Sequence, residues 1–306
     1  MSKRNTQEAK RAARERLLAE REKQKKKEKV RRQLVVAGSV VGVLAVAGGI
    51  GVAVANMDSG GGEGDATDWS AVRAQLEGEE PAEDETVYPA DAPAHASGDD
   101  GLTVLVGDPE AANTVTLFED PRCPSCAAFE QGVGETIHQD IADGAYNVEY
   151  VFGTFLDDRL GGSGSRNAVS ALGAALDVSP EAFQGLHEQL YLAENHPSEQ
   201  VDDFANDDLL IELAQNVPEL EGNAEFEAAV LDSTFAAWAL QMSDKFNADE
   251  EVTGTPSAKV NGTVVEVPRD AQSWAAMLST VLVDDQPADD AAEGTEEGTE
   301  EEAGTE

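Results

Sequence analysis

The feature that most limits how this 306-residue chain can fold is a run of twenty-two uncharged residues, from Leu34 to Ala55. As a helix, this run is about 33 Å long and covers the ~30 Å hydrocarbon core of a bilayer. Residues 1–33 carry a net charge of about +9, whereas the residues after the run carry about −49. Because basic segments stay on the cytoplasmic side, the sequence predicts a single-pass protein of the cell membrane with residues 56–306 outside the cytoplasm.

The same run allows a second interpretation, a secretory signal peptide. Ala53-Val54-Ala55 has the small residues of a cleavage site. Signal peptides, however, have an apolar segment of ~7 to 15 residues behind a short basic segment. Here the apolar segment has twenty-two residues and the basic segment before it has 33, so both are longer than in a signal peptide. We therefore expect an uncleaved anchor rather than cleavage after Ala55. Both interpretations place the rest of the chain in an oxidising compartment, where disulfides persist.

The sequence divides into five segments. Residues 1–33 are predicted to be a basic cytoplasmic segment that can approach anionic lipid, and nucleic acid is not an expected partner. The membrane anchor follows at 34–55. Residues 56–100 and 284–306 are rich in Gly, Asp, Glu and Thr or Pro, and we expect an acidic disordered linker and an acidic disordered tail. Residues 101–283 are enough for one domain with a sizeable core.

Within residues 101–283, the apolar pattern predicts a mixed α/β domain. Asn261-Gly262 between two β-branched runs is a strong hairpin signal. The predicted order is strand 102–106, strand 114–118, helix 127–142, strand 148–155, a helical insertion over about 163–247, strands 258–260 and 263–267, and helix 271–282. The insertion is predicted to contain helices at 166–176, 180–194, 207–216 and 224–246. This order describes a mixed sheet covered by helices, with the insertion over one end.

The chain has only two cysteines, in the sequence Cys123-Pro124-Ser125-Cys126 directly after a predicted strand. Two intervening residues place both sulfurs at the first turn of the next helix, where they can form a reversible disulfide. The free N–H groups and the dipole of that turn stabilise a thiolate at Cys123. Pro124 fits the first turn because its missing N–H is not needed there. Arg122 adds a cation beside the sulfur or points into solvent.

Two structural roles for the pair are less consistent with the sequence. A zinc site would use the pair as half of a four-ligand cage. His138 has no second histidine three to five residues on, and the other histidines are scattered. A purely structural disulfide across so short a loop would remove little chain entropy. We therefore expect no metal ligands and a redox role for the pair.

Three sequence elements together resemble the DsbA-like branch of the thioredoxin superfamily, including its membrane-anchored actinobacterial members. They are Asp120-Pro121-Arg122-Cys123-Pro124-Ser125-Cys126 after an apolar strand, a helical block, and Gly254-Thr255-Pro256 followed by Val260-Asn261-Gly262. The resemblance implies a thioredoxin-like mixed sheet with an inserted helical subdomain. It also implies that Cys123 forms a mixed disulfide with a client cysteine and that Cys126 resolves this mixed disulfide. Pro124 and Ser125 are implied to support the active-site loop.

The resemblance further implies that Pro256 is cis and faces the cysteines, and that Thr255 offers backbone hydrogen bonds to a client. The partners it implies are client proteins with cysteines and an unidentified protein that resets the pair. No metal or organic cofactor is expected, because the two sulfurs carry both electrons.

Several points stay open on the sequence alone. Oxidising members often have histidine where Ser125 stands, so oxidase, reductase and isomerase roles are all compatible with the motif. A tethered binding module with an inert Cys123 is a further alternative. Glu119 and Asp120 are either proton-handling carboxylates or solvated loop residues. Four more side chains are expected to pack in the interior or lie on the surface: His138, His187, His196 and Trp238.

Overall fold

The computed structural model describes residues 67–82 and 85–283. The predicted basic segment, membrane anchor and acidic tail, at 1–33, 34–55 and 284–306, lie outside these residues. Among the helices that the structure does describe, none has the length and apolar character needed to cross a bilayer.

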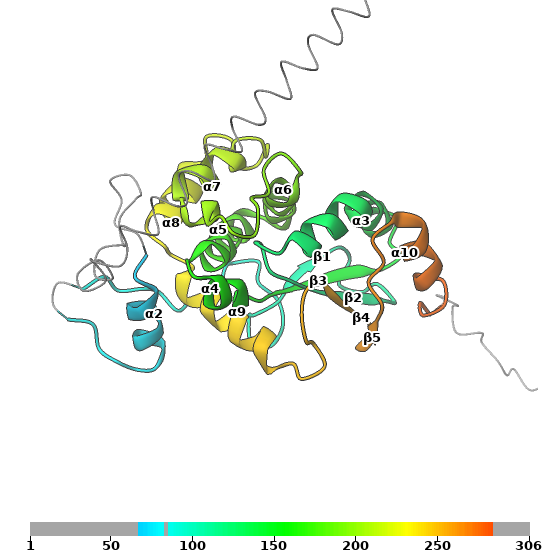
Figure 1. Cartoon of the computed structure of the whole chain (residues 1–306), viewed down its shortest axis with the longest axis horizontal. Coiled ribbons are helices and arrows are strands. Elements are labelled where there is room, and N and C mark those ends of the chain that lie inside the picture. The colour runs from blue at the N-terminus through cyan, green and yellow to red at the C-terminus, as the bar shows by residue number, and fades with distance from the viewer. Residues whose placement is uncertain (1–66, 83–84, 284–306) are drawn as a thin grey trace, which may run out of the picture. The chain divides into compact units, whose positions relative to one another are not determined.

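Five strands form one mixed sheet in the order β1-β3-β2-β4-β5 (Figure 1). Only β2 and β3 run parallel, and the other neighbours are antiparallel. The strands are β1 (Val104–Val106), β2 (Thr114–Glu119), β3 (Asn147–Phe152), β4 (Ser257–Val260) and β5 (Thr263–Val265). The predicted mixed α/β sheet is confirmed, and the Asn261-Gly262 turn joins β4 to β5 with positive φ at both residues.

Helices surround the sheet, and a helical block lies beside it (Figure 1). Outside the block, α3 (Pro124–Ala142) and α10 (Ala271–Leu278) pack against each other. The block contains α4 (Phe155–Leu160), α5 (Gly164–Val178), α6 (Pro180–Tyr191), the short 3₁₀ turn η2 (Asp203–Ala205), α7 (Asp207–Ala214), α8 (Ala224–Leu231) and α9 (Ala236–Ala248). Helix α3 also contacts α6 of the block. The helical segment thus begins at α4, earlier than the predicted insertion.

Alternation along the central strands gives each face of the sheet its own apolar layer. Phe118 of β2 meets Phe246 of α9, with ring centroids 6.1 Å apart. On the opposite face, Tyr150 of β3 meets Phe183 of α6 at 5.5 Å. Because Glu119 follows Phe118 directly, the pleat turns its carboxylate toward the same side as Tyr150, into the interior.

Two predicted elements differ from the structure in ways that change the path of the chain. The strand predicted over 148–155 stops at Phe152, and Phe155 begins α4. The helix predicted over 224–246 is two helices, α8 and α9, separated by a turn in which Ser233 has a φ of 52°. A residue in the left-handed region ends a helix, because it directs the chain away from the helix axis.

The predicted disordered linker differs from the structure, which forms helix α2 (Trp69–Leu76) within it. Asp68 caps this helix by accepting hydrogen bonds from the N–H groups of Ser70 and Ala71. Val72 is fully buried against Ala236, Ala237 and Leu240 of α9. The few apolar residues of this acidic segment recur at helical spacing, so they cover α9 although the segment as a whole is polar.

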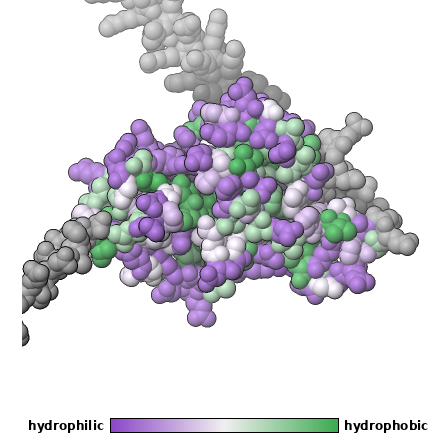
Figure 2. Space-filling view, turned by 180° about the vertical axis from the view of Figure 1, so that it is seen from behind, coloured by the Kyte–Doolittle hydropathy of each residue, from purple (hydrophilic) through white to green (hydrophobic). Residues whose placement is uncertain are grey.

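The surface seen from behind is mainly hydrophilic, with separate small apolar patches (Figure 2). The exposed large apolar side chains lie in different parts of the chain, at Val87, Leu160, Val201, Leu231, Val264 and Val283. Scattered residues of this kind are usual on soluble surfaces and do not mark a binding site.

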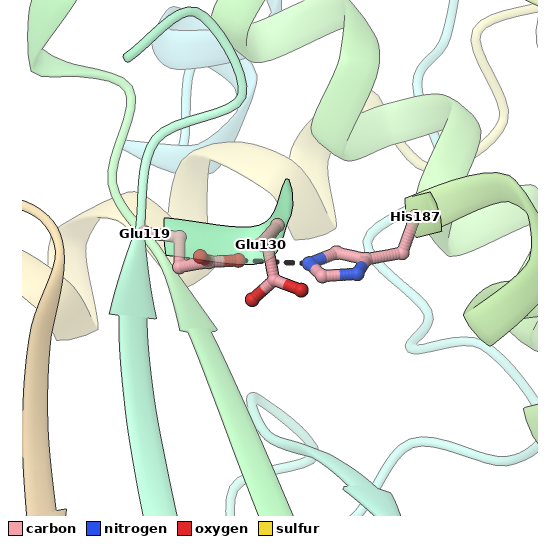
Figure 3. A group of neighbouring side chains, drawn as sticks. All are labelled: Glu119, Glu130 and His187. Atoms are coloured by element: carbon pink, nitrogen blue, oxygen red, sulfur yellow. Dashed lines mark hydrogen bonds and ion pairs between the residues drawn. The ribbon is translucent and has the colours of Figure 1, made fainter. Parts of the chain in front are cut away.

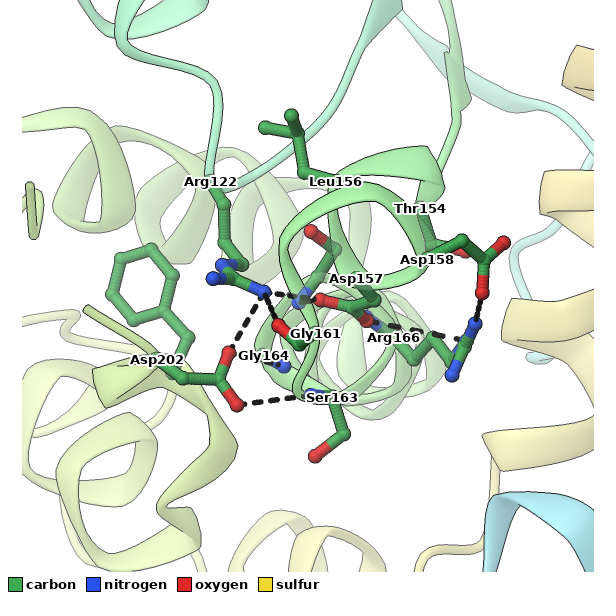
Figure 4. Close-up of polar contacts among 12 residues, drawn as sticks. Arg122, Thr154, Leu156, Asp157, Asp158, Gly161, Ser163, Gly164, Arg166 and Asp202 are labelled. Atoms are coloured by element: carbon green, nitrogen blue, oxygen red, sulfur yellow. Dashed lines mark hydrogen bonds and ion pairs between the residues drawn. The ribbon is translucent and has the colours of Figure 1, made fainter. Parts of the chain in front are cut away.

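Arg122, the residue before Cys123, is buried in an ion-pair network with the helical block (Figure 4). Its Nη1 lies 2.7 Å from Asp157 Oδ1 and 2.9 Å from Asp202 Oδ1. It also donates to the carbonyl oxygen of Gly161. The expectation that Arg122 lies beside the sulfur or in solvent is therefore wrong, because two carboxylates hold its side chain in the interior.

The same two carboxylates cap the start of α5. Asp157 accepts hydrogen bonds from the N–H groups of Ser165 and Arg166, and Asp202 accepts from those of Ser163 and Gly164. A side chain on Gly164 would clash, because its Cβ would lie 2.6 Å from Asp202 Oδ1. The carboxylates of Asp157 and Asp202 thus contact both Arg122 and the N-terminus of α5, and they connect the active-site loop to this helix.

Replacing Arg122 by Met should lower the free energy of unfolding by about 3–5 kcal/mol, because Asp157 would keep a buried and uncompensated charge. Denaturant unfolding of the soluble domain measures this loss. The matched control is Arg73→Met, whose ion pair with Asp244 is exposed and should contribute no more than about 1 kcal/mol. Equal losses in the two variants would contradict the structural role assigned to Arg122.

Candidate active site

Cys123 is the N-cap residue of α3, and Pro124 is the first residue of the helix. Strand β2 ends at Glu119, and a tight turn closed by a hydrogen bond from Cys123 N to Asp120 O leads into the helix. Cys123 has extended backbone angles and its side chain caps no backbone group, so the sulfur remains available at the helix end. The strand-to-helix junction predicted for the pair is present.

The Thr255–Pro256 segment lies against the cysteines, although 132 residues separate it from Cys123. The sulfur of Cys123 lies 3.6 Å from the carbonyl oxygen of Thr255, to which it donates as a thiol. The Thr255–Pro256 peptide bond is cis. Strand β4 begins at the next residue and pairs with β2, which brings the two segments together.

The environment of Cys123 favours its thiolate. Hydrogen bonds from the Cys126 thiol and from the backbone N–H groups at the start of α3 lower the pKa of Cys123 to about 6, although burial opposes them. The side chain is only 7% exposed. A thiol with this pKa is largely ionised at neutral pH and is therefore an activated nucleophile.

Cys126 has the opposite character. It is fully buried, and burial raises its pKa well above that of an ordinary thiol, with the hydrogen bond to Cys123 and the charge of Glu119 acting in the same direction. Both cysteines are free thiols in the structure. The pair thus combines one reactive sulfur with one protected sulfur in the first turn of the same helix.

The loop around the pair is partly accessible to solvent. Pro124 is exposed, and Ser125, Thr255 and Pro256 are half-buried. The predicted supporting residues Pro124 and Ser125 and the predicted substrate-binding residues Thr255 and Pro256 therefore form a partly accessible rim beside Cys123.

Glu119 and Asp120 are both fully buried, so the interpretation of them as solvated loop residues is wrong. Asp120 accepts hydrogen bonds from Ser165 Oγ and from the N–H groups of Arg122 and Leu156. Burial raises the pKa of Asp120 to about 7 and that of Glu119 to about 8. Asp120 holds the turn before Cys123, whereas Glu119 faces the sheet interior.

A second polar group lies behind the pair and was not predicted. Glu119 Oε2 lies 2.7 Å from His187 Nε2, and Glu130 of α3 approaches both (Figure 3). His187 was expected to pack in the interior or lie on the surface; it is buried, with its ring tilted against Tyr150 and edge-on to Tyr191. The one sequence signal for this group was a glutamate at the end of an apolar strand, since a buried carboxylate requires partners.

Comparison with known proteins agrees with this geometry. The family model described as thioredoxin matches residues 99–280, more than half of the chain. Disulfide bond formation protein D of Bacillus subtilis is 26% identical over 162 residues, which cover 53% of this chain and 69% of that protein.

Two solved structures extend the comparison. Reduced disulfide bond oxidoreductase DsbG of Mycobacterium tuberculosis matches with a TM-score of 0.50 and 27% identity, covering 60% of this chain and 88% of that one. Oxidised BdbD of B. subtilis matches with a TM-score of 0.50 and 26% identity, covering 62% and 97%. With its cysteine pair at the head of α3, the chain belongs to the thioredoxin family and, within it, to the DsbA-like thiol–disulfide oxidoreductases.

Proposed function

We propose that the chain is a membrane-tethered, extracytoplasmic enzyme that exchanges disulfides with the cysteines of exported proteins. The observation that carries the proposal is the position of the Cys123 sulfur at the start of α3, 3.6 Å from the carbonyl oxygen of Thr255 in the half-buried Thr255–Pro256 segment. An activated thiolate next to a partly open backbone segment suits attack on, or by, a sulfur of a bound polypeptide.

In the oxidising direction, a client thiolate attacks Cys123 in the Cys123–Cys126 disulfide. The bond between the two cysteines breaks, a client–Cys123 disulfide forms, and Cys126 leaves as a thiolate that takes up a proton. A second client thiolate then attacks the client sulfur, which completes the client disulfide and releases Cys123 as a thiolate. Two electrons have passed from the client to the pair, and a redox partner must accept them to reset it.

In the reducing or isomerising direction the same residues act in reverse. The Cys123 thiolate attacks a client disulfide, and Cys126 resolves the mixed disulfide by attacking Cys123. Thr255 and Pro256 hold the client backbone in both directions. Ser125 carries no charge and leaves both directions chemically open, so the reduction potential decides between them.

The proposed location is based on sequence. The uncharged run Leu34–Ala55 has the length of a membrane span, and the basic segment precedes it. An oxidising compartment also suits a pair that must be reset by disulfide exchange. The alternative of an inert binding module is less consistent with the site, because an inert Cys123 would keep an ordinary or raised pKa.

Alkylation of the reduced domain should show an activated thiol. The rate at Cys123 is expected to rise with pH around a midpoint of about 6, the pKa of its thiol, rather than near 9. A Cys126→Ala variant removes the strongest hydrogen bond to the sulfur, so its midpoint should move upward. Stopped-flow alkylation across pH measures both values, and a wild-type midpoint near that of a free thiol would refute the activated nucleophile.

Equilibration with glutathione buffers should place the pair among disulfide donors. Stabilising the thiolate stabilises the reduced form, so we expect a reduction potential above about −230 mV. Because the pKa of Cys123 is lowered, this stabilisation of the reduced form is present above the pKa of an unfolded thiol and disappears as pH falls through about 6. A potential well below that of the glutathione pool would instead indicate a reductase.

The full chain with Cys126→Ala should accumulate mixed disulfides with exported proteins in the membrane fraction, because no resolving thiol remains to release them. Non-reducing gels followed by identification of the adducts measure this. The control Cys123→Ala, which keeps the buried thiol, should form almost none. Adducts with cytoplasmic proteins alone, or recovery in the soluble fraction, would contradict the proposed location.

A further inference from the structure

Three metal-binding side chains from three different elements converge behind the cysteine pair. Glu119 comes from the end of β2, Glu130 from the second turn of α3, and His187 from α6 (Figure 3). One ligand atom from each lies within 4.8 Å of the other two. The closest pair, Glu119 Oε2 and His187 Nε2, is 2.7 Å apart.

Several polar atoms in this group have no partner. Glu119 Oε1, Glu130 Oε1 and the Tyr191 hydroxyl form no hydrogen bond to any residue that the structure describes. Glu119 and Tyr191 are no more than 1% exposed, so bulk water does not reach them in compensation. Buried oxygen atoms without partners are costly, and a bound cation would satisfy the two carboxylates at once.

The charge balance of the two glutamates also favours a bound cation. Within the described part of the chain, neither Glu119 nor Glu130 forms an ion pair with a lysine or arginine. Arg122, a buried cation of the loop that follows Glu119, is held instead by Asp157 and Asp202. A divalent cation would balance two carboxylates and a neutral imidazole, and so leave a buried site without net charge.

The ligand types select the metal. Imidazole together with carboxylates suits Zn²⁺, whereas Ca²⁺ requires six to eight oxygen ligands, about twice what this group offers. In a tetrahedral site with bonds of ~2.0 Å the ligand atoms lie roughly 3.3 Å apart. The half-buried Glu130 side chain therefore has to approach the other two ligands.

A cavity of about 340 Å³ between α3 and α6 gives access to this group. Glu130 and Tyr191 form part of its wall together with His138 and Glu188. We propose that Glu119, Glu130 and His187 form a Zn²⁺ site, entered through this cavity. The site is separate from the thiol chemistry proposed above, since neither cysteine is a ligand and neither lines the cavity.

The test uses the full chain in detergent, with the Cys123–Cys126 disulfide formed and with metal removed by chelation, so that thiols cannot bind the ion. Calorimetric titration with Zn²⁺ should give one site per chain. Glu130→Gln removes a ligand oxygen charge and should weaken binding by about 100-fold or more. The matched control is Glu135→Gln, which removes the same charge from the same helix and the same cavity wall and should bind like wild type.

Three results would overturn the proposal: absence of a stoichiometric site in the oxidised wild-type protein, equal affinities for the two variants, or binding only after reduction, which would place the ion on the cysteines. If Glu130→Gln did not fold, Co²⁺ in place of Zn²⁺ would decide with wild-type protein alone. The oxidised protein should then give visible bands typical of nitrogen and oxygen ligands. Absence of these bands would refute the site.

Discussion

The buried contact between Arg122 and the carboxylates of Asp157 and Asp202 determines how the two halves of the domain meet. Arg122 belongs to the turn that delivers Cys123, whereas both carboxylates cap the first turn of α5. One guanidinium therefore fixes the active-site loop and the helical block with the same contacts. Such a pair is costly to bury, so its main effect is to make other arrangements of the two halves unfavourable.

The reactivity of the two cysteines follows from where α3 begins. At the helix terminus Cys123 receives hydrogen bonds from N–H groups that have no partner in the helix, and three residues later Cys126 is covered from solvent. The acidic group behind them has the opposite effect on Cys126, since the Glu119 charge disfavours its thiolate.

The sequence predicted those parts of the fold that depend on local signals. The strand-to-helix junction at Cys123 and the hairpin at Asn261-Gly262 are specified by residues adjacent in the chain, and both are present. The break at Ser233 was missed, because it depends on how α8 and α9 pack rather than on a strong helix breaker. Helix α2 was missed because the acidic composition of its segment outweighed a few apolar residues.

The same reasoning applies to the site. Cys123 and Cys126 are evident from spacing, and the position of Thr255 followed from a family resemblance rather than from its own pattern. The contact between Glu119 and His187 joins residues 68 positions apart and arises only when α6 packs on β3. No periodicity or motif links two such residues, so this contact could be found only in three dimensions.

Under the proposed membrane location, helix α2 also limits how far the catalytic domain can extend from its anchor. If the anchor ends at Ala55, only thirteen residues precede Trp69, and even fully extended they span no more than about 45 Å. A linker reaching to residue 100 would have allowed about 160 Å. The shorter tether would confine the cysteine pair to a thin layer above the bilayer, where exported chains emerge before they diffuse away.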